Sequence, residues 1–474
     1  MNRIVILDVR SIQFAPHSGV SRFTQCLAEG LAEVARTQKN IQLVVAGTRE
    51  FSGIDSPSLG MGTLKSYFEQ STLPVSYVGL GSTSSWWVRK PRFLWSTIVF
   101  VWFAKRVRNL SGHSKTIVWL APDNIDRPLR FFGDEFPKKS DGSSHKIAHI
   151  VQIVHDLIAL RYPTKSNRFL RLQLKVLLGP VFRKGVFFAP ISDLTRAELL
   201  ETVPAECVTN AQVPNRIGAQ FSADLRKVNT FDKSMLELEI QSQIIGLKEA
   251  FGKYQLSDFS GLARGSGRIR FLLGVGRDER YKSWSDVADV VARLAPVFDH
   301  NLWFLHVCPS SAVNSYYEQL ARSHEESLTF GVCTIYPRIR IIRVTDVSDL
   351  GLACLYRYAD ALIHLSKAEG YGLPLAEAYL AGLPVFAVQR NGFAEVFRRL
   401  PDQSAVHFFD STPDYELLAG VLFPDGALEA RVNSRSQCSK KRLADRVVDN
   451  LLLSNASMGM LANQIIDEVT ATQY

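Results

Sequence analysis

The sequence predicts an α/β protein built from two doubly wound domains, each with a mainly parallel sheet. The chain has 474 residues, more than one hydrophobic core usually holds, so two domains are expected. Near the N-terminus a buried strand at 3–9 is followed by an amphipathic helix at 18–34 and a second buried strand at 41–47. The order of strand, glycine turn and helix restarts at 269–294. Strands that alternate with helices in this way are typical of parallel sheets covered by helices.

The predicted N-terminal domain spans residues 1–215. Its first helix repeats apolar side chains at the spacing of one helix face, at Val20, Phe23, Leu27, Leu31 and Val34. Two further apolar runs, 114–122 and 149–157, are expected to be buried strands. The run 184–203 then indicates a strand, a Ser-Asp cap and a helix, which continues the alternation of strands and helices.

The segment 216–267 differs, because it is polar, helical in pattern in its middle and glycine-rich at its end. We interpret it as an inserted helical linker between the domains. Residues 268–450 form the predicted C-terminal domain, with buried strands expected at 302–308, 339–344, 359–366 and 382–389. Residues 451–474 are predicted to be a helix that packs back on the N-terminal domain.

The composition is that of an ordinary globular protein, with 46% hydrophobic and 21% charged residues. The net charge of +9 favours anionic partners, such as phosphorylated substrates, nucleic acid or an anionic membrane surface. The Lys and Arg clusters are too short for a nucleic-acid-binding arm, so no nucleic acid partner is expected. Six cysteines stand without a close pair or metal-ligand spacing, which predicts a reducing compartment and no metal. The first residues lack a signal-peptide layout, so the cytoplasm is the expected location.

One segment, 86–109, resembles a membrane-contact sequence. Its apolar run, Phe93–Ala104, is too short to span a bilayer as a helix. Tryptophans and basic residues flank that run, as is usual at a membrane interface. The alternative is a buried or amphipathic helix of the domain, and both interpretations remain open. Interfacial contact would place the protein at the inner face of the cytoplasmic membrane.

The most distinctive segment is residues 364–385, HLSKAEGYGLPLAEAYLAGLPV. Gly370 and Gly372 allow backbone angles that other residues avoid, and Pro374 suits the first position of a helix. The free N–H groups of residues 372–376 are therefore expected to form an anion site at a helix N-terminus. Phosphate is the expected anion.

Two glutamates flank this turn. Glu369 lies before it, and Glu377 lies one turn into the helix, where a carboxylate can bind a vicinal diol such as a ribose. Taken singly, Glu369 also fits a solvated loop residue, and Glu377 fits a partner of the helix dipole. The glycine pattern and both spacings together favour a functional role for the pair.

This segment resembles the Glu–seven residues–Glu motif of retaining glycosyltransferases with the GT-B fold, a large family that includes bacterial mannosyl-, glucosyl- and rhamnosyltransferases. The residues that carry the resemblance are Ser366, Glu369, Gly370, Tyr371, Gly372, Leu373, Pro374, Glu377, Ala378, Gly382, Pro384 and Val385. The resemblance implies two Rossmann-like domains that face each other across a cleft. It also implies that Glu369 contacts the donor sugar, that the turn amides hold sugar and diphosphate, and that Glu377 binds the nucleotide ribose.

Other segments extend the resemblance over most of the chain. LGVGRDERYKSW (273–284) is similar to the family's strand, glycine and Arg…Lys segment. This similarity implies that Gly276 lies at the donor and that Arg277 and Lys282, both at the cleft surface, neutralise its diphosphate. SGVSRF resembles the N-terminal glycine loop, which places Gly19 close to the diphosphate. VHDLIALRYP implies that His155 faces the donor sugar, although His155 by itself also fits a core histidine.

We therefore expect a retaining hexosyltransferase with Glu369, His155, Arg277 and Lys282 as its catalytic residues. With two cations and a helix terminus at the diphosphate, neither a metal nor another cofactor is expected. GDP-mannose is the preferred donor, with UDP-glucose, other UDP-hexoses and dTDP-rhamnose as alternatives, and the expected acceptor is a surface glycan on a lipid carrier. The rival hypotheses are a sugar-nucleotide epimerase or phosphorylase on the same fold, and a nucleotide-sugar-binding scaffold protein without activity.

Overall fold

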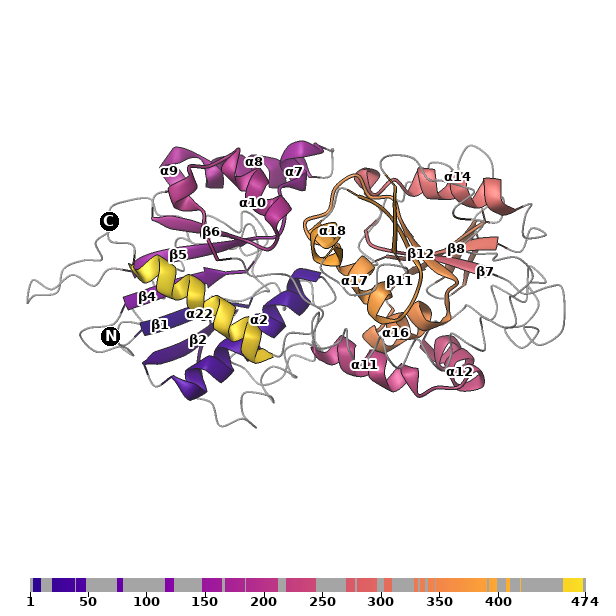
Figure 1. Ribbon diagram of the computed structural model, residues 1–474, viewed down its shortest axis with the longest axis horizontal. Helices are drawn as coiled ribbons and strands as arrows, with labels where there is room; N and C mark the ends of the chain where they lie inside the picture. The colour runs from indigo at the N-terminus through magenta and orange to yellow at the C-terminus, as the bar shows by residue number, and fades with distance from the viewer. Residues whose placement is uncertain are drawn as a thin grey trace, which may run out of the picture. The chain divides into compact units, whose positions relative to one another are not determined.

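The computed structural model describes residues 3–9, 19–38, 40–47, 75–79, 116–122, 147–163, 167–183, 185–211, 219–243, 270–277, 279–295, 302–308, 328–330, 333–336, 340–345, 347–389, 392–398, 406–409, 418 and 455–471. The chain forms two compact units (Figure 1). Unit 1 contains residues 1–218 and 453–474, and unit 2 contains residues 219–452. Each unit has its own sheet and helices, which confirms the predicted α/β class.

Within the described residues, unit 1 is built on a six-stranded sheet in the order β3-β2-β1-β4-β5-β6. Its strands are β1 (Arg3–Asp8), β2 (Ile41–Gly47), β3 (Val75–Gly79), β4 (Thr116–Ala121), β5 (Ile147–Val154) and β6 (Val186–Pro190). Every neighbouring pair is parallel. The strand order changes direction between β1 and β4, which is the switch point where doubly wound sheets usually bind ligands.

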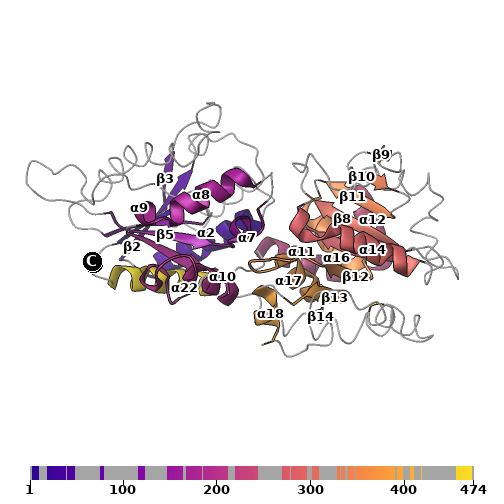
Figure 2. The same cartoon turned by 90° about the horizontal axis from the view of Figure 1, so that it is seen from above.

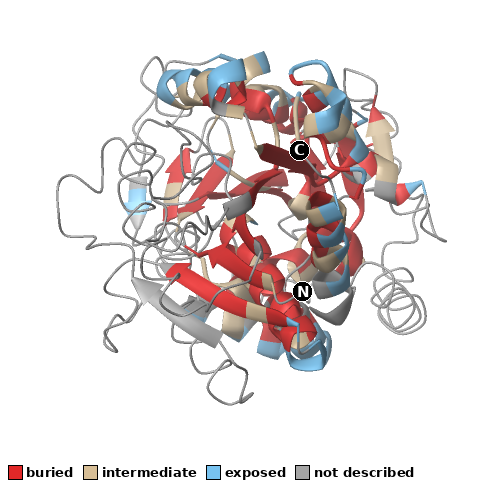
Figure 3. Ribbon diagram, turned by 90° about the vertical axis from the view of Figure 1, so that its left-hand side faces the viewer, coloured by how far each residue is buried: buried red, intermediate tan, exposed pale blue. Residues whose placement is uncertain are grey.

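The described helices of unit 1 are α2 (Gly19–Thr37), α7 (Ile158–Arg161), α8 (Arg168–Leu178), α9 (Pro180–Arg183), α10 (Asp193–Leu200) and α22 (Asn455–Ala471). A 3-10 turn lies at Ala205–Cys207. The face of α2 that the apolar spacing predicts is buried, at Phe23, Leu27, Leu31 and Val34. Figure 3 shows the buried strands in red beneath helices whose outward faces are pale blue.

The C-terminal helix α22 belongs to unit 1 and packs against α2 (Figure 1). One face of α22 is buried, at Ala462, Ile465, Ile466 and Val469. Asp467 pairs with Arg3 at the start of β1. The carboxylate of Glu468 accepts hydrogen bonds from the N–H groups of Asn210 and Ala211, at 2.7 and 3.1 Å. The far end of the chain therefore completes the first unit.

Unit 2 has an eight-stranded sheet among its described residues, in the order β14-β13-β12-β7-β8-β11-β10-β9. The strands are β7 (Arg270–Val275), β8 (Leu302–Cys308), β9 (Leu328–Phe330), β10 (Cys333–Tyr336), β11 (Ile341–Thr345), β12 (Ala361–His364), β13 (Val385–Val388) and β14 (Val406–Phe409). The pairs from β14 to β11 are parallel. β10 is antiparallel to both of its neighbours and lies with β9 at one end of the sheet, whereas β14 lies at the other (Figure 2).

The described helices of unit 2 are α11 (Ala219–Asn229), α12 (Lys233–Gln243), α14 (Trp284–Leu294), α16 (Asp349–Tyr358), α17 (Leu373–Leu380) and α18 (Gly392–Phe397), with a 3-10 turn at Arg280–Lys282. Both α11 and α12 pack against α16. The rings of Phe221 on α11 and Tyr356 on α16 meet edge to face, 6.0 Å apart. Residues 219–243, interpreted from sequence as part of a linker, are therefore part of unit 2.

The segment 86–109 lies outside the described residues, so its contact with a membrane stays a prediction. Among the helices that the structure describes, none combines the length and the apolar character needed to cross a bilayer.

Candidate active site

Three side chains of unit 2 meet at the carboxyl ends of two neighbouring strands. Lys282 follows β7, His364 ends β12, and Glu369 lies in the loop between β12 and α17. Because β7 and β12 are paired in parallel, the segments that follow them start at the same edge of the sheet. Nζ of Lys282 forms an ion pair with Oε1 of Glu369, and Nε2 of His364 lies 2.7 Å from the same oxygen.

The carboxyl group of Glu369 is ionised in this cluster. Burial by itself would raise its pKa. The charge of Lys282, and after it the contact with His364, outweighs burial and lowers the pKa to about 2. Burial lowers the pKa of His364, and the hydrogen bond to Glu369 opposes that shift. The imidazole is therefore neutral at pH 7. Since the carboxylate can only accept, Nε2 of His364 carries the proton and donates it.

Further contacts hold the loop that carries Lys282. Nε1 of Trp284 donates to the carbonyl oxygen of Arg277 at 3.0 Å, and Nε2 of His306 donates to that of Gly276 at 2.9 Å. Gly276 has φ of +147°, a conformation that favours glycine. The rings of Trp284 and His306 lie 4.2 Å apart between centroids. Burial lowers the pKa of His306 to about 3, against the effect of its hydrogen bond to Gly276, so this ring is also neutral.

The two predicted cations have different surroundings. Arg277 is exposed, as expected, and the structure shows no side-chain partner for it among the described residues. Lys282 is only 8% exposed, which corrects the expectation that both lie at the surface. Lys282 is buried because its ammonium group forms an ion pair with Glu369. The aliphatic part of the side chain is buried together with the ammonium group.

The turn Gly370–Leu373 leads directly into α17. Gly372 has φ of +89° and is the N-cap residue, and α17 begins at Leu373, so Pro374 is its second residue rather than its first. The carbonyl oxygen of Gly372 accepts from the N–H groups of Leu375 and Ala376, at 3.0 and 3.3 Å.

The anion site is therefore smaller than the sequence predicts. Pro374 has no N–H, and those of Leu375 and Ala376 are used within the turn. The N–H groups of Gly372 and Leu373 make no hydrogen bond within the described residues. They are the donors of the predicted set 372–376 that stay available to an anion.

Glu377 lies on the buried side of α17 and is 2% exposed. Its Oε2 accepts a hydrogen bond from the hydroxyl of Tyr356 on α16, at 2.9 Å. Tyr356 is itself buried against Phe221 of α11. The carboxylate is thus fixed in orientation by a helix that precedes the motif in sequence.

Gly392 begins α18 and lies against the same turn. A Cβ at this position would stand 2.2 Å from the carbonyl oxygen of Gly370 and 3.0 Å from Cα of Tyr371. Both are backbone atoms, so neither can turn aside as the end of a flexible side chain can. The close approach of α18 to the turn therefore requires glycine at residue 392.

His155 follows β5 in unit 1 and is buried. Its Nε2 lies 2.6 Å from the carbonyl oxygen of Pro122, and since a carbonyl only accepts, this nitrogen carries the proton. Burial lowers the pKa of His155 to about 4, against the effect of that hydrogen bond, and the ring is neutral at pH 7. The ring meets Phe23 of α2 edge to face at 4.9 Å between centroids. His155 therefore packs against the helix that Gly19 begins.

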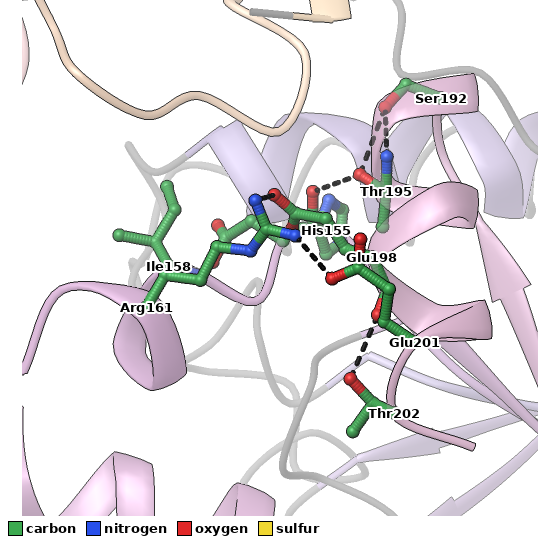
Figure 4. A network of polar contacts seen from close by, with 9 residues as sticks. His155, Ile158, Arg161, Ser192, Thr195, Glu198, Glu201 and Thr202 are labelled. Carbon is green, nitrogen blue, oxygen red and sulfur yellow. Dashed lines mark hydrogen bonds and ion pairs between the residues drawn. The ribbon is translucent and has the colours of Figure 1, made fainter.

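Helix α10 holds the backbone around His155 (Figure 4). Oγ1 of Thr195 donates to the carbonyl oxygen of His155 at 3.3 Å. Arg161 of α7 forms ion pairs with Glu198 and Glu201, at 3.2 and 2.9 Å. These contacts fix the turn after β5, and the role of His155 at the donor sugar stays a prediction.

Most of the predicted site residues belong to unit 2. Unit 2 contains Gly276, Arg277, Lys282, Glu369, Gly370, Tyr371, Gly372, Leu373 and Glu377, and unit 1 contains Gly19 and His155. Sequence reasoning missed His364, His306, Tyr356 and Gly392. The available signal for the two histidines was a polar residue inside the apolar strands LWFLHVC and ALIH.

One region of unit 2 is similar to a known protein family. Residues 268–412 match the family model described as Glycosyl transferases group 1. The structure is similar to that of WaaG, described as a glycosyltransferase involved in lipopolysaccharide biosynthesis, with 15% identity and a TM-score of 0.51 over 98% of this chain and 99% of that one. No curated protein matches the sequence significantly.

Two other solved structures cover the chain equally well. Sucrose-phosphate synthase from Thermosynechococcus elongatus has 14% identity and a TM-score of 0.57 over 100% of both chains. HepE from Anabaena, in complex with UDP-glucose, has 13% identity and a TM-score of 0.51 over 99% of this chain and 100% of that one. The fold is therefore GT-B, as predicted. The match to the group 1 family model lies within unit 2.

Proposed function

We propose that the protein is a retaining glycosyltransferase that moves a hexose from a nucleoside diphosphate sugar to an acceptor hydroxyl. The observation that carries this proposal is the buried cluster of Glu369, Lys282 and His364 beside the turn Gly370–Leu373. It combines an ionised carboxylate with a cation and available amide donors, and it lies inside the region that matches group 1 glycosyl transferases.

The donor diphosphate would bind between the cations and the turn. Lys282 and Arg277, with the N–H groups of Gly372 and Leu373, would face the negative charge that grows on the leaving diphosphate. Glu369 would contact the donor sugar. Glu377, held by Tyr356, would bind the ribose with its carboxylate. For retention, the departing phosphate would help to take the acceptor proton on the same face of the sugar.

The sequence resemblance favours GDP-mannose as the donor. UDP-glucose is the second candidate, because the similar structure of HepE is described in complex with UDP-glucose, and another similar structure, from E. coli, is described as bound with UDP-2-fluoro glucose. The proposed acceptor is a glycan or a lipid-linked glycan of surface polysaccharide assembly, at the inner face of the cytoplasmic membrane. The similarity to WaaG, which is described as involved in lipopolysaccharide biosynthesis, supports an acceptor of this kind.

A thermal-shift panel of nucleotides and nucleotide sugars tests the proposal. The correct donor is expected to raise Tm, because a ligand that binds only the folded protein stabilises it in proportion to RT ln(1 + [L]/Kd). Turnover with that donor then separates an enzyme from a binding scaffold. A Tm shift with a nucleotide sugar, but no transfer or hydrolysis with any acceptor preparation, would favour the scaffold hypothesis.

Excess EDTA is expected to leave activity largely intact. Lys282, Arg277 and two amide donors would supply the positive charge that some glycosyltransferases take from a divalent metal. The rate of sugar transfer is measured before and after chelation, and again after Mg²⁺ or Mn²⁺ is added back. Complete loss of activity that either metal restores would contradict the proposed metal-independent site.

The variant Gly392→Ala is expected to weaken donor binding. The added Cβ would collide with the backbone of Gly370, and overpacking of this kind typically costs about 1–3 kcal/mol. The measurement is Kd for the nucleotide and Tm of the free protein. Gly179→Ala in unit 1, where a Cβ would lie 3.1 Å from a carbonyl oxygen of Val176, is the control and should keep normal affinity. Unchanged nucleotide affinity in Gly392→Ala would show that the turn does not hold the donor.

A further inference from the structure

Helix α8 of unit 1 has two apolar faces. Leu174, Leu177 and Leu178 are buried, as expected for a helix that covers a sheet. On the other side, Phe169 is 66% and Leu172 59% exposed. Their spacing of three residues places them side by side on the solvent face of the helix. A surface helix normally has polar residues in that position, so the second apolar face needs a separate explanation.

The apolar surface continues into α9. Val181, just beyond the break at Gly179, is 73% exposed. Figure 1 shows α8 and α9 next to each other at the top of unit 1. We define the α8–α9 surface by Phe169, Leu172 and Val181 together with the basic residues of the two helices.

The helices of this surface contain basic residues and no acidic ones. The segment 157–192 contains no Asp or Glu, and its basic residues are Arg161, Lys165, Arg168, Arg171, Lys175, Arg183 and Lys184. Arg168 and Lys175 are exposed on α8, and the guanidinium of Arg168 lies 4.8 Å from the centroid of the Phe169 ring. Arg161 differs from these residues, because it forms ion pairs with Glu198 of α10 and with Glu201, the C-cap residue of that helix.

We propose that the α8–α9 surface docks on an anionic lipid membrane. An anionic membrane can bind both kinds of side chain on this surface. Its phosphates attract the basic side chains, and its acyl chains accommodate the exposed apolar ones. Nucleic acid would leave the apolar side chains without a partner. A second copy of this face would bring the same positive charges together. The proposal does not depend on the reaction that unit 2 catalyses.

Sedimentation of the full-length protein with lipid vesicles tests this proposal. The vesicles contain either phosphatidylcholine alone or phosphatidylcholine with phosphatidylglycerol, at low and at high salt. The protein is expected to bind the anionic vesicles and to lose affinity as salt screens the charges. Two variants change the surface: Phe169→Ser with Leu172→Ser, and Arg168→Gln with Lys175→Gln.

The charge variant is expected to bind anionic vesicles about 30-fold more weakly, at about fivefold for each cation removed. The apolar variant is expected to lose at least about tenfold, because its side chains no longer enter the acyl region. All four side chains are exposed, so Tm should stay unchanged in both variants.

Matched controls come from unit 2. Met235→Ser with Leu238→Ser removes two side chains of α12 that are 50% and 67% exposed. Arg226→Gln with Lys227→Gln removes two exposed cations of α11 and changes the net charge by the same amount. Neither control should alter vesicle binding.

Three results would overturn the proposal. These are no vesicle binding by the unchanged protein, equal vesicle binding by all variants, and binding that is lost only when the basic residues of 86–109 are neutralised. A large fall in Tm of the apolar variant would show that the face is covered by the chain itself. Conversion of a dimer into a monomer by that variant, without a change in vesicle binding, would assign the face to a second copy.

Discussion

Replacing Lys282 with alanine is expected to lower turnover by about 10²-fold or more, the usual effect of losing one group that stabilises a developing negative charge. The ammonium group is paired with Glu369 and lies beside Gly276, where a Cβ would stand 3.7 Å from Nζ. Its removal therefore affects both the proposed diphosphate site and the carboxylate next to the sugar. The measurement is kcat and KM for transfer from the nucleotide sugar identified by thermal shift.

The same substitution is expected to destabilise unit 2. Lys282 is 8% exposed, and removing one partner of a buried ion pair typically costs about 3–5 kcal/mol, because the other charge stays buried. A fall in activity could then reflect unfolding alone. The double variant Lys282→Met with Glu369→Gln removes both charges, so we expect it to recover most of the lost Tm but none of the lost turnover.

Lys367→Ala is the matched control. The side chain of Lys367 is exposed, and its backbone N–H donates to the carbonyl oxygen of Tyr281 at 2.8 Å, a bond that the substitution keeps. This variant should retain normal Tm and nearly normal kcat. Arg277→Ala should lose turnover without losing stability, because Arg277 is exposed. Near-normal kcat in folded Lys282→Ala would remove Lys282 from the donor site.

The turn and its two carboxylates could be predicted from the sequence because their signals are local. Glycines, a proline and Glu369 and Glu377 lie within a few residues of one another, and their order alone indicates a strand, a turn and a helix. The number of backbone N–H groups of the turn that stay available to an anion could not be predicted from the sequence. It depends on which N–H groups the carbonyl oxygen of Gly372 takes, and the structure shows that it takes two.

The contacts that support the site come from distant parts of the chain. His306 reaches Gly276 because β8 pairs with β7 in a register that places His306 opposite Gly274. Tyr356 reaches Glu377 from a preceding helix, and Gly392 meets the turn from a following one. Sheet register and helix packing decide these distances, and a single sequence contains no direct signal for either. The packing of α11 and α12 on α16 escaped prediction for the same reason.

The stability of unit 2 is expected to fall in acid because of Glu369. The pKa of this carboxyl is about 2 in the folded protein, against an ordinary value of 4.5. A carboxyl whose pKa is lower in the folded than in the unfolded protein contributes stability. This contribution is fully present above the pKa of the unfolded protein and is lost as the pH falls towards the pKa of the folded protein. The difference corresponds to about 3 kcal/mol, of which roughly 2 kcal/mol is lost by pH 3.

Glu369→Gln is expected to remove this part of the acid sensitivity, because an amide does not titrate. Tm is measured from pH 7 to pH 3 for the unchanged protein, for this variant and for Glu206→Gln, which alters an exposed glutamate of unit 1. The difference in Tm between the unchanged protein and Glu369→Gln should shrink as the pH falls below 4.5, and Glu206→Gln gives the effect of replacing an exposed carboxylate for comparison. His364→Leu removes a hydrogen bond that lowers the pKa of Glu369, so it should move the same transition to higher pH. Parallel pH profiles for the unchanged protein and Glu369→Gln would mean that Lys282 and His364 do not hold this carboxylate in its charged form.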